Sequence, residues 1–156
     1  MADARFEDGG EAPLYLGAET PEDLGVISAL VQDAVFPISE MTYRHRRFAL
    51  LVNRFRWEDR EAALAARRPF ERVQSVLAID GVLAVKTHGI DRHETGTVLS
   101  LLAIEFQPGA DGAGRLVLVL AGDGAVALEV EALDVTLRDV TRPYVALAGR
   151  APDHGA

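Results

Sequence analysis

The chain alternates between short apolar runs and polar or glycine-rich breaks, and its central apolar run is Phe48–Val52. Runs of this length that are rich in Phe, Leu and Val are typical of β-strands. Because no polar residue interrupts the run, we expect a strand over residues 47–57 that is buried on both faces. Charged residues, mostly arginines, close both ends of this strand.

Other apolar runs are short enough to pair with the central strand. Asp80-Gly81 separates two of them and is a strong signal for a two-residue hairpin. The turn-rich segments 44–46, 108–114 and 122–124 predict further reversals of the chain. The predicted strands cover residues 14–16, 38–43, 70–79, 82–88, 98–106, 116–120 and 126–131. Residues 132–140 fit either a bulged continuation of the last strand or a short helix.

One helix is predicted near the N-terminus. Thr20 is a good N-cap, Pro21 suits the first helical position, and apolar residues follow at helical spacing up to Val31. The helix should end near Ala34, because Pro37 disfavours helical backbone in the residue before it. Residues 58–68 have helical composition but little apolar surface, which indicates a marginal surface helix or an ordered loop.

These elements predict an α+β fold with one N-terminal helix on a mainly antiparallel, strongly curved sheet of about seven or eight strands. Regularly spaced strands joined by tight turns favour a roll or a partly open barrel. A roll of the pleckstrin-homology (PH) type is an architectural analogue that says little about function. We expect a single domain over 13–147, with flexible tails at 1–12 and 148–156.

Composition places the chain among ordinary globular proteins. Of its 156 residues, 49% are apolar and 26% are charged, and no apolar run approaches the roughly 18 residues that cross a bilayer. The N-terminus is acidic and has no apolar core, so we expect no signal peptide. The absence of cysteine excludes disulfides, thiolate catalysis and zinc-finger sites. We therefore expect a soluble cytoplasmic protein that does not bind membranes.

The net charge of −8 disfavours nonspecific binding to nucleic acid, but the charge is unevenly distributed. Residues 44–72 contain nine arginines and four acids, a local charge of +5. Arg44, Arg46, Arg54 and Arg56 could form an exposed cationic stripe.

Together with Trp57, this stripe could bind a phosphorylated ligand or single-stranded RNA. We favour the alternative that the arginines pair with the many carboxylates of the chain. As exposed ion pairs contribute little, replacing Arg54 and Arg56 by glutamine should then lower stability only modestly. Asn53 shares a strand face with Trp57 and is expected to be a buried polar group that bridges to a neighbouring loop, with a ligand contact as the alternative.

No motif indicates catalysis. His88, Asp91, His93 and Glu94 lie in one polar segment, but their spacing matches no established metal motif, so we expect a surface turn without metal. Glu129 and Glu131 share a strand face that we expect to be solvated. The glycines of 108–114 precede a strand, whereas a phosphate-binding loop needs a helix N-terminus. We therefore expect no catalytic residue and no cofactor.

The chain resembles a family of alphaproteobacterial proteins known as domain of unknown function 2948. The similar stretches are VQDAVFPI, RRFALLVNRFRWE, VLAVKTHGIDR, VLSLLAIEFQPG and ALEVEALDVTLRDV. The resemblance implies a cytoplasmic bacterial protein and brings no activity, cofactor or catalytic residue with it.

Three classes of function remain at this point. The one we favour is a nonenzymatic module that binds another protein or acts as an adaptor. The alternative is a binder of RNA or of a phosphorylated ligand through the arginine-rich segment 44–72. An enzyme is disfavoured, because no nucleophile–base pair or metal set can be recognised.

Overall fold

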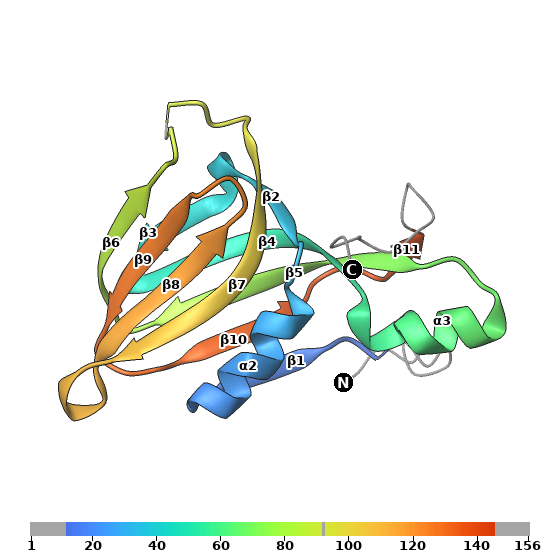
Figure 1. Cartoon of the computed structure of the whole chain (residues 1–156), viewed down its shortest axis with the longest axis horizontal. Helices are drawn as coiled ribbons and strands as arrows, with labels where there is room; N and C mark the ends of the chain where they lie inside the picture. Colours follow the sequence, from blue (N-terminus) through green and yellow to red (C-terminus); the bar gives the residue numbers. More distant parts are fainter. Residues whose placement is uncertain (1–11, 92, 146–156) are drawn as a thin grey trace.

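The described residues fold into one antiparallel sheet of eleven strands with two short α-helices (Figure 1). The structure is a computed structural model that describes residues 12–91 and 93–145. The tails predicted at 1–12 and 148–156 lie outside these residues, except for residue 12 itself. The strands are β1 (Tyr15–Ala18), β2 (Val35–Pro37), β3 (Met41–Arg44), β4 (Arg47–Phe55), β5 (Glu71–Asp80), β6 (Val82–His88), β7 (Val98–Pro108), β8 (Gly114–Leu120), β9 (Ala125–Val130), β10 (Val135–Asp139) and β11 (Tyr144–Val145).

The order of strands across the sheet is β1-β10-β5-β4-β2-β7-β8-β9-β6, with β11 paired to β5 and β3 paired to β4. The sheet is mainly antiparallel, as predicted, but it is not closed and not strongly curled, so the predicted roll or barrel is wrong. The prediction of seven or eight strands is also too low. The strands β2 and β11 have only three and two residues, which is too short to leave a period in the sequence.

Both predicted helical segments are helices in the structure. The helix α2 (Pro21–Leu30) begins as predicted, because the side-chain oxygen of Thr20 accepts a hydrogen bond from the backbone N–H of Asp23 at 3.2 Å. It packs against β1 and β7 through Leu24 and Ile27. The short helix α3 (Arg60–Ala66) forms where a marginal helix or a loop was expected, and it lies at the far end of β4 and β5 in Figure 1. The part of the chain that the structure describes therefore contains two α-helices rather than the one expected.

The central strand β4 is confirmed, but only one of its faces is deeply buried. Phe48, Leu50 and Val52 are at most 2% exposed, whereas Ala49 and Leu51 on the opposite face are only half-buried. The expectation of burial on both faces is therefore wrong. The larger side chains of the even-numbered face fill the core, and the odd-numbered face is the outer surface of the sheet.

The predicted hairpin at Asp80-Gly81 is also wrong. Gly81 makes a sharp turn with φ +72°, but β5 and β6 do not pair with each other. Both edges of β5 are already occupied, by β4 on one side and by β10 and β11 on the other. The strand β6 therefore pairs with β9 at the other end of the sheet.

The ambiguous segment 132–140 contains the separate strand β10, which leaves β9 and pairs with β5 and β1. It is neither a helix nor a continuation of β9. The turns predicted at 44–46, 108–114 and 122–124 do join strands that pair with each other, namely β3 to β4, β7 to β8 and β8 to β9.

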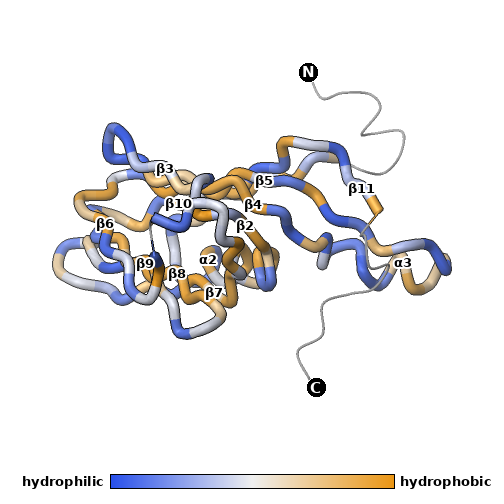
Figure 2. Tube along the Cα trace, turned by 90° about the horizontal axis from the view of Figure 1, so that it is seen from above, coloured by the Kyte–Doolittle hydropathy of each residue, from blue (hydrophilic) through white to orange (hydrophobic). Residues whose placement is uncertain are grey.

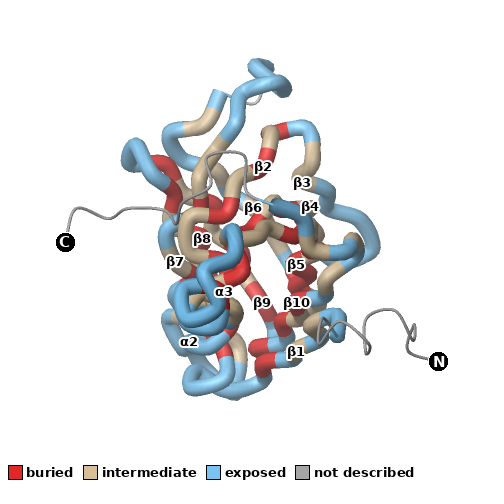
Figure 3. Tube along the Cα trace, turned by 90° about the vertical axis from the view of Figure 1, so that its right-hand side faces the viewer, coloured by how far each residue is buried: buried red, intermediate tan, exposed pale blue. Residues whose placement is uncertain are grey.

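Buried apolar residues from both halves of the sheet and from α2 form one core (Figure 3). Toward α3, the strands β4 and β5 become hydrophilic (Figure 2). No helix within residues 12–91 and 93–145 is long and apolar enough to span a membrane.

Candidate binding site

Arg54 does not belong to an exposed stripe, because its side chain is fully buried at 0% exposure. It lies on the same face of β4 as Val52, which is the face that points into the protein. Its guanidinium donates hydrogen bonds to Ser75 Oγ at 3.1 Å, to both carboxylate oxygens of Glu58 at 2.9 and 2.8 Å, and to Asp139 Oδ1 at 3.0 Å. Ser75 Oγ in turn donates to Asp139 Oδ1 at 2.7 Å. We call these four residues, Arg54, Glu58, Ser75 and Asp139, the Arg54 cluster.

The charges of the Arg54 cluster stabilise one another. Burial favours the neutral form of Glu58, but the hydrogen bond and the charge of Arg54 outweigh burial, so the pKa of Glu58 lies below its ordinary value. Burial also disfavours the charged form of Arg54, yet Glu58 and Asp139 raise its pKa above the ordinary value. Both side chains are therefore held in their charged forms.

Arg56 is also largely buried and pairs with carboxylates on both sides. Its guanidinium contacts Glu71 and lies 3.6 Å from Asp59. Asp59 also receives two hydrogen bonds from Arg68, at 2.6 and 2.7 Å. The hydrogen bond from Arg68 is the main cause that lowers the pKa of Asp59. These pairs hold the α3 segment against the sheet.

The other predicted site residues have structural partners as well. Trp57 Nε1 donates to the carbonyl oxygen of Gln32 at 3.0 Å. Asn53 is half-buried on the outer face, where it accepts a hydrogen bond from Arg72 and donates to Tyr144 Oη at 2.7 Å. The expectation that Asn53 is fully buried is wrong, but its bridging contact to the segment after β10 agrees with the expected structural role.

Arg44 and Arg46 lie at the opposite end of β4, roughly 26 Å from Arg54 along the extended strand. Arg46 pairs with Glu131 at 2.6 Å, and both side chains are about half exposed. Arg44 is exposed, and its side chain forms no ion pair with a described residue. The six predicted residues therefore form no single site, and Arg54 and Arg56 are not accessible to a ligand.

The polar segment after β6 forms a turn, as predicted. The backbone N–H of His93 bonds to Asp91 Oδ1 at 3.0 Å. Within the described residues, no group of three metal-ligating side chains comes together. Glu129 and Glu131 pair with different arginines, Arg115 and Arg46, so they do not act together as two free carboxylates.

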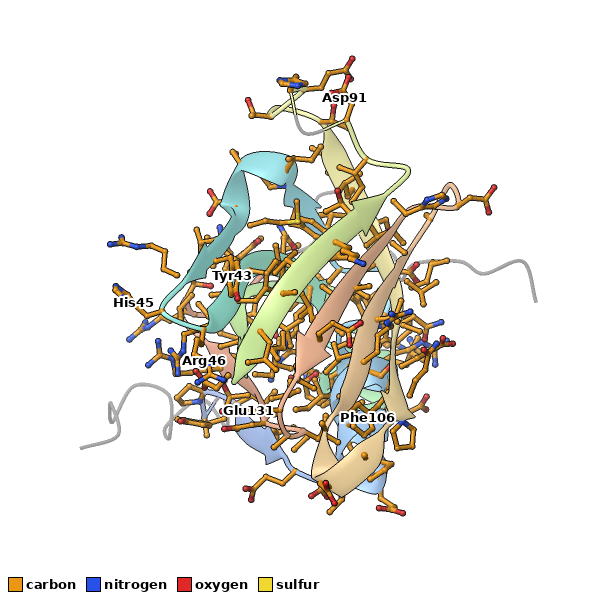
Figure 4. All side chains as sticks on the ribbon, turned by 90° about the vertical axis from the view of Figure 1, so that its left-hand side faces the viewer. Tyr43, His45, Arg46, Asp91, Phe106 and Glu131 are labelled. Carbon is orange, nitrogen blue, oxygen red and sulfur yellow. The ribbon has the colours of Figure 1, made fainter. Side chains whose placement is uncertain are left out.

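The feature that stands out instead is a gap between two strand edges. Among the described strands, β3 pairs only with β4, and β6 pairs only with β9. Each strand therefore has one edge without a neighbouring strand. Figure 4 shows these edges facing each other, with Tyr43 beside the gap.

The two strands are joined at one end of this gap. Tyr43 Oη donates to the carbonyl oxygen of Val82 at 2.8 Å, and the backbone N–H of Val82 bonds to the carbonyl oxygen of Arg46 at 2.9 Å. The Arg46–Glu131 pair lies at the same end (Figure 4). These contacts fix the spacing of β3 and β6 at the start of β6.

Beyond this joined end, a pocket of about 190 Å³ lies between the strands. Its lining residues are Met41, Thr42, Tyr43, Phe48, Val85 and Thr87. Met41 and Val85 also pack against the core, so the pocket gives access to apolar surface. Its volume is comparable to the engineered cavity of about 150 Å³ that binds benzene, so it can hold one apolar side chain of moderate size.

The backbone of β3 offers hydrogen-bonding groups to this gap. His45 and Arg46 both have positive φ (51° and 61°) and form a two-residue turn, so Arg44 and Arg47 are the hydrogen-bonded pair that closes it. Hydrogen bonding alternates along an antiparallel pair, so the N–H and C=O of Tyr43 point away from β4 and toward the gap. The carbonyl of Met41 points the same way, while its N–H bonds to the carbonyl of Ile38. We call this gap, with its pocket and its exposed backbone groups, the β3–β6 groove.

Sequence patterns gave no sign of this groove. Met41, Val85 and Thr87 look like ordinary strand residues, and the sequence predicted that β6 would pair with β5. Only the pairing of β6 with β9 places Val85 and Thr87 opposite Met41 and the rest of β3. A signal would have required knowledge of strand pairing, which the periodicity of a single strand does not contain.

Comparison with known proteins identifies the family. Residues 14–154 match the model of the family described as "Protein of unknown function (DUF2948)". The chain belongs to this family. The match confirms the resemblance seen in the sequence and covers every strand of the DUF2948 fold described above. No curated protein and no solved structure matches the chain.

Proposed function

We propose that this DUF2948 protein is a binding module that recognises an extended segment of another protein in the β3–β6 groove. The segment adds as a strand along β3 and places one apolar side chain in the 190 Å³ pocket. The observation that carries this proposal is the presence, among the described strands, of an edge without a neighbour on each side of a pocket whose lining includes Met41, Phe48 and Val85. Strand addition is a common mode of peptide recognition, in which backbone hydrogen bonds supply affinity and pockets supply specificity.

The charge beside the groove indicates one further property of the segment. Arg44, at the end of β3, is exposed, and its guanidinium forms no ion pair with any of the described residues. A carboxylate of the bound segment can pair with it at little cost, because no internal ion pair has to break. We therefore expect segments with an apolar residue and a nearby acidic residue.

The joined end of the groove supports binding by fixing its geometry. Tyr43 and Arg46 hold β6 at a set distance from β3 through two hydrogen bonds. A site that is already formed before binding loses less conformational freedom when the segment arrives. The alternative of an RNA-binding surface loses its support, because Arg54 and Arg56 are buried in ion pairs.

The experiment that tests this proposal uses a displayed library of random 12-residue peptides. The full chain is used for selection, and the enriched peptides are synthesised and measured by calorimetry. Thr87→Trp fills the pocket and should weaken binding by at least about tenfold. Thr136→Trp places the same side chain at a half-buried threonine on β10 and should leave affinity unchanged.

Two further measurements identify the site and its charge preference. Amide resonances of Tyr43 and Val85 should shift on titration with the peptide. Arg44→Gln should weaken binding and reduce its dependence on salt, because one ion pair is lost. The proposal is wrong if no peptide is enriched, or if the enriched peptides bind Thr87→Trp as tightly as the wild type.

A further inference from the structure

The outer face of β6, β9, β8 and β7 is a sheet surface that no described helix or strand covers, and its charges are ordered. In Figure 1 these strands lie at the front left, with neither helix across β8 and β9. The strand registers align their outward side chains in rows that cross the sheet. One row reads Lys86, Ala127, Val117 and Glu105 from β6 to β7, and in the next row Glu129 of β9 lies beside Arg115 of β8.

The middle of this face is apolar and flat. Ala127 and Val117 are half-buried, and so are Ala125 and Val119 one row further along. Alanine and valine are short side chains, so a second sheet can approach to the roughly 10 Å that separates packed sheets. Charged side chains stand only around this apolar middle.

The charges are arranged so that the face is complementary to itself. A two-fold axis that runs along the strands, between β8 and β9, exchanges the two ends of every row. It places Lys86 of one copy opposite Glu105 of the other, and Arg115 opposite Glu129. Isologous contacts of this kind are the usual basis of homodimers.

Lys86 and Glu105 do not pair within one chain, because three strand spacings, roughly 14 Å, separate them. The face is also neutral, since Lys86 and Arg115 balance Glu105 and Glu129, whereas the whole chain carries −8. Two copies can therefore approach through this face without the repulsion that the rest of the surface produces.

We propose that a second copy of this chain packs on the outer face of β6, β9, β8 and β7 and forms a two-fold symmetric dimer of stacked sheets. Four strands and three rows cover roughly 20 by 20 Å, about 400 Å² per copy. Standard interfaces bury about 800 Å² per partner, so the dimer is weak, with a dissociation constant in the micromolar range. The β3–β6 groove is a different surface, so this inference does not depend on peptide binding.

Sedimentation velocity on the full chain, at concentrations from about 1 to 300 µM, tests the dimer directly. Wild type should shift from monomer to dimer across this range. The dimer has two contacts between Lys86 of one copy and Glu105 of the other. Lys86→Glu places two carboxylates opposite each other at both of these contacts, and Glu105→Lys places two lysines there. Each variant should dimerise at least about tenfold more weakly than the wild type.

An equimolar mixture of Lys86→Glu and Glu105→Lys should recover dimerisation. In the mixed dimer, carboxylates face lysines at both contacts, so a heterodimer forms although each variant associates with itself only weakly. Glu22→Lys, on the exposed surface of α2, makes the same charge change as Glu105→Lys but away from the face, and should leave the association unchanged. A wild type that stays monomeric to the highest concentration would overturn the proposal, and so would a mixture that does not recover.

Discussion

Replacing Arg54 by methionine should destabilise the protein far more than an arginine substitution on the surface. Methionine keeps much of the side-chain volume but removes the cation that faces Glu58 and Asp139. Asp139 is only 6% exposed and cannot regain water, whereas Glu58 is 29% exposed and can do so in part. Removing one partner of a buried ion pair typically costs about 3–5 kcal/mol, and we expect Arg54→Met to lie in this range.

The free energy of unfolding can be followed by urea denaturation, with the fluorescence of Trp57 as the signal, since it is the only tryptophan of the chain. With a typical urea dependence of about 1–3 kcal/mol per molar, the midpoint should fall by roughly 2 M. Arg46→Met is the matched control. Its ion pair with Glu131 is exposed on both sides (55% and 54%), so it should cost no more than about 1 kcal/mol.

A second substitution tests the cause of this effect. If the uncompensated charge of Asp139 causes the loss, adding Asp139→Asn to Arg54→Met should restore part of the stability. The reasoning would be refuted by an Arg54→Met variant whose midpoint equals that of Arg46→Met. The expected large loss of stability would instead contradict the prediction, drawn from the sequence, that Arg54 is exposed and that its replacement is tolerated.

Three further predictions follow from burial, backbone geometry and charge. Phe48→Ala should lower the free energy of unfolding by about 3–5 kcal/mol in urea denaturation, because Phe48 is 2% exposed, whereas Leu64→Ala, at a residue 49% exposed, should lower it by less than about 1 kcal/mol. Equal losses of stability would show that β4 is not central. Gly114→Ala should lower the melting temperature, because a Cβ there would lie 2.5 Å from the carbonyl oxygen of Gln107 and 2.7 Å from the ring of Phe106, both in β7. Gly96→Ala is the control, since a Cβ at Gly96 would meet no atom within 4 Å. The pKa of Glu58 lies below its ordinary value of 4.5 in the folded state, so the stability that its charged form contributes is present above pH 4.5 and is lost as the pH falls through the folded-state pKa. Glu58→Gln should therefore flatten the decline of the urea midpoint below about pH 4.5, and an unchanged decline would contradict this assignment.

Local signals in the sequence predicted local structure well. The cap at Thr20 and the following proline placed the start of α2, and the glycine-rich turns correctly joined β7 to β8 and β8 to β9. These features depend on neighbouring residues, whose backbone preferences can be recognised in a short window. The family was also recognisable from stretches of the sequence, and residues 14–154 confirm it.

The errors arose where the answer depends on distant partners. The position of β4 was correct, but burial was expected on both of its faces and Arg54 was expected in solvent, because arginine is usually exposed. Glu58 lies only four residues away, but the other two partners of Arg54, Ser75 and Asp139, lie 21 and 85 residues further along the chain. No periodicity within β4 shows that these partners exist.

The strand order that keeps the predicted site residues apart also produces the β3–β6 groove. Since both edges of β5 are occupied, β6 cannot form the hairpin that Asp80-Gly81 favours, and it ends the sheet opposite β3. A free strand edge presents N–H and C=O groups whatever its side chains are, so a site built on such an edge needs no residue motif. Side chains add only the pocket and the charge of Arg44. The proposed binding of an extended segment depends mainly on backbone edges, so the sequence does not indicate it and only the pairing of the strands suggests it.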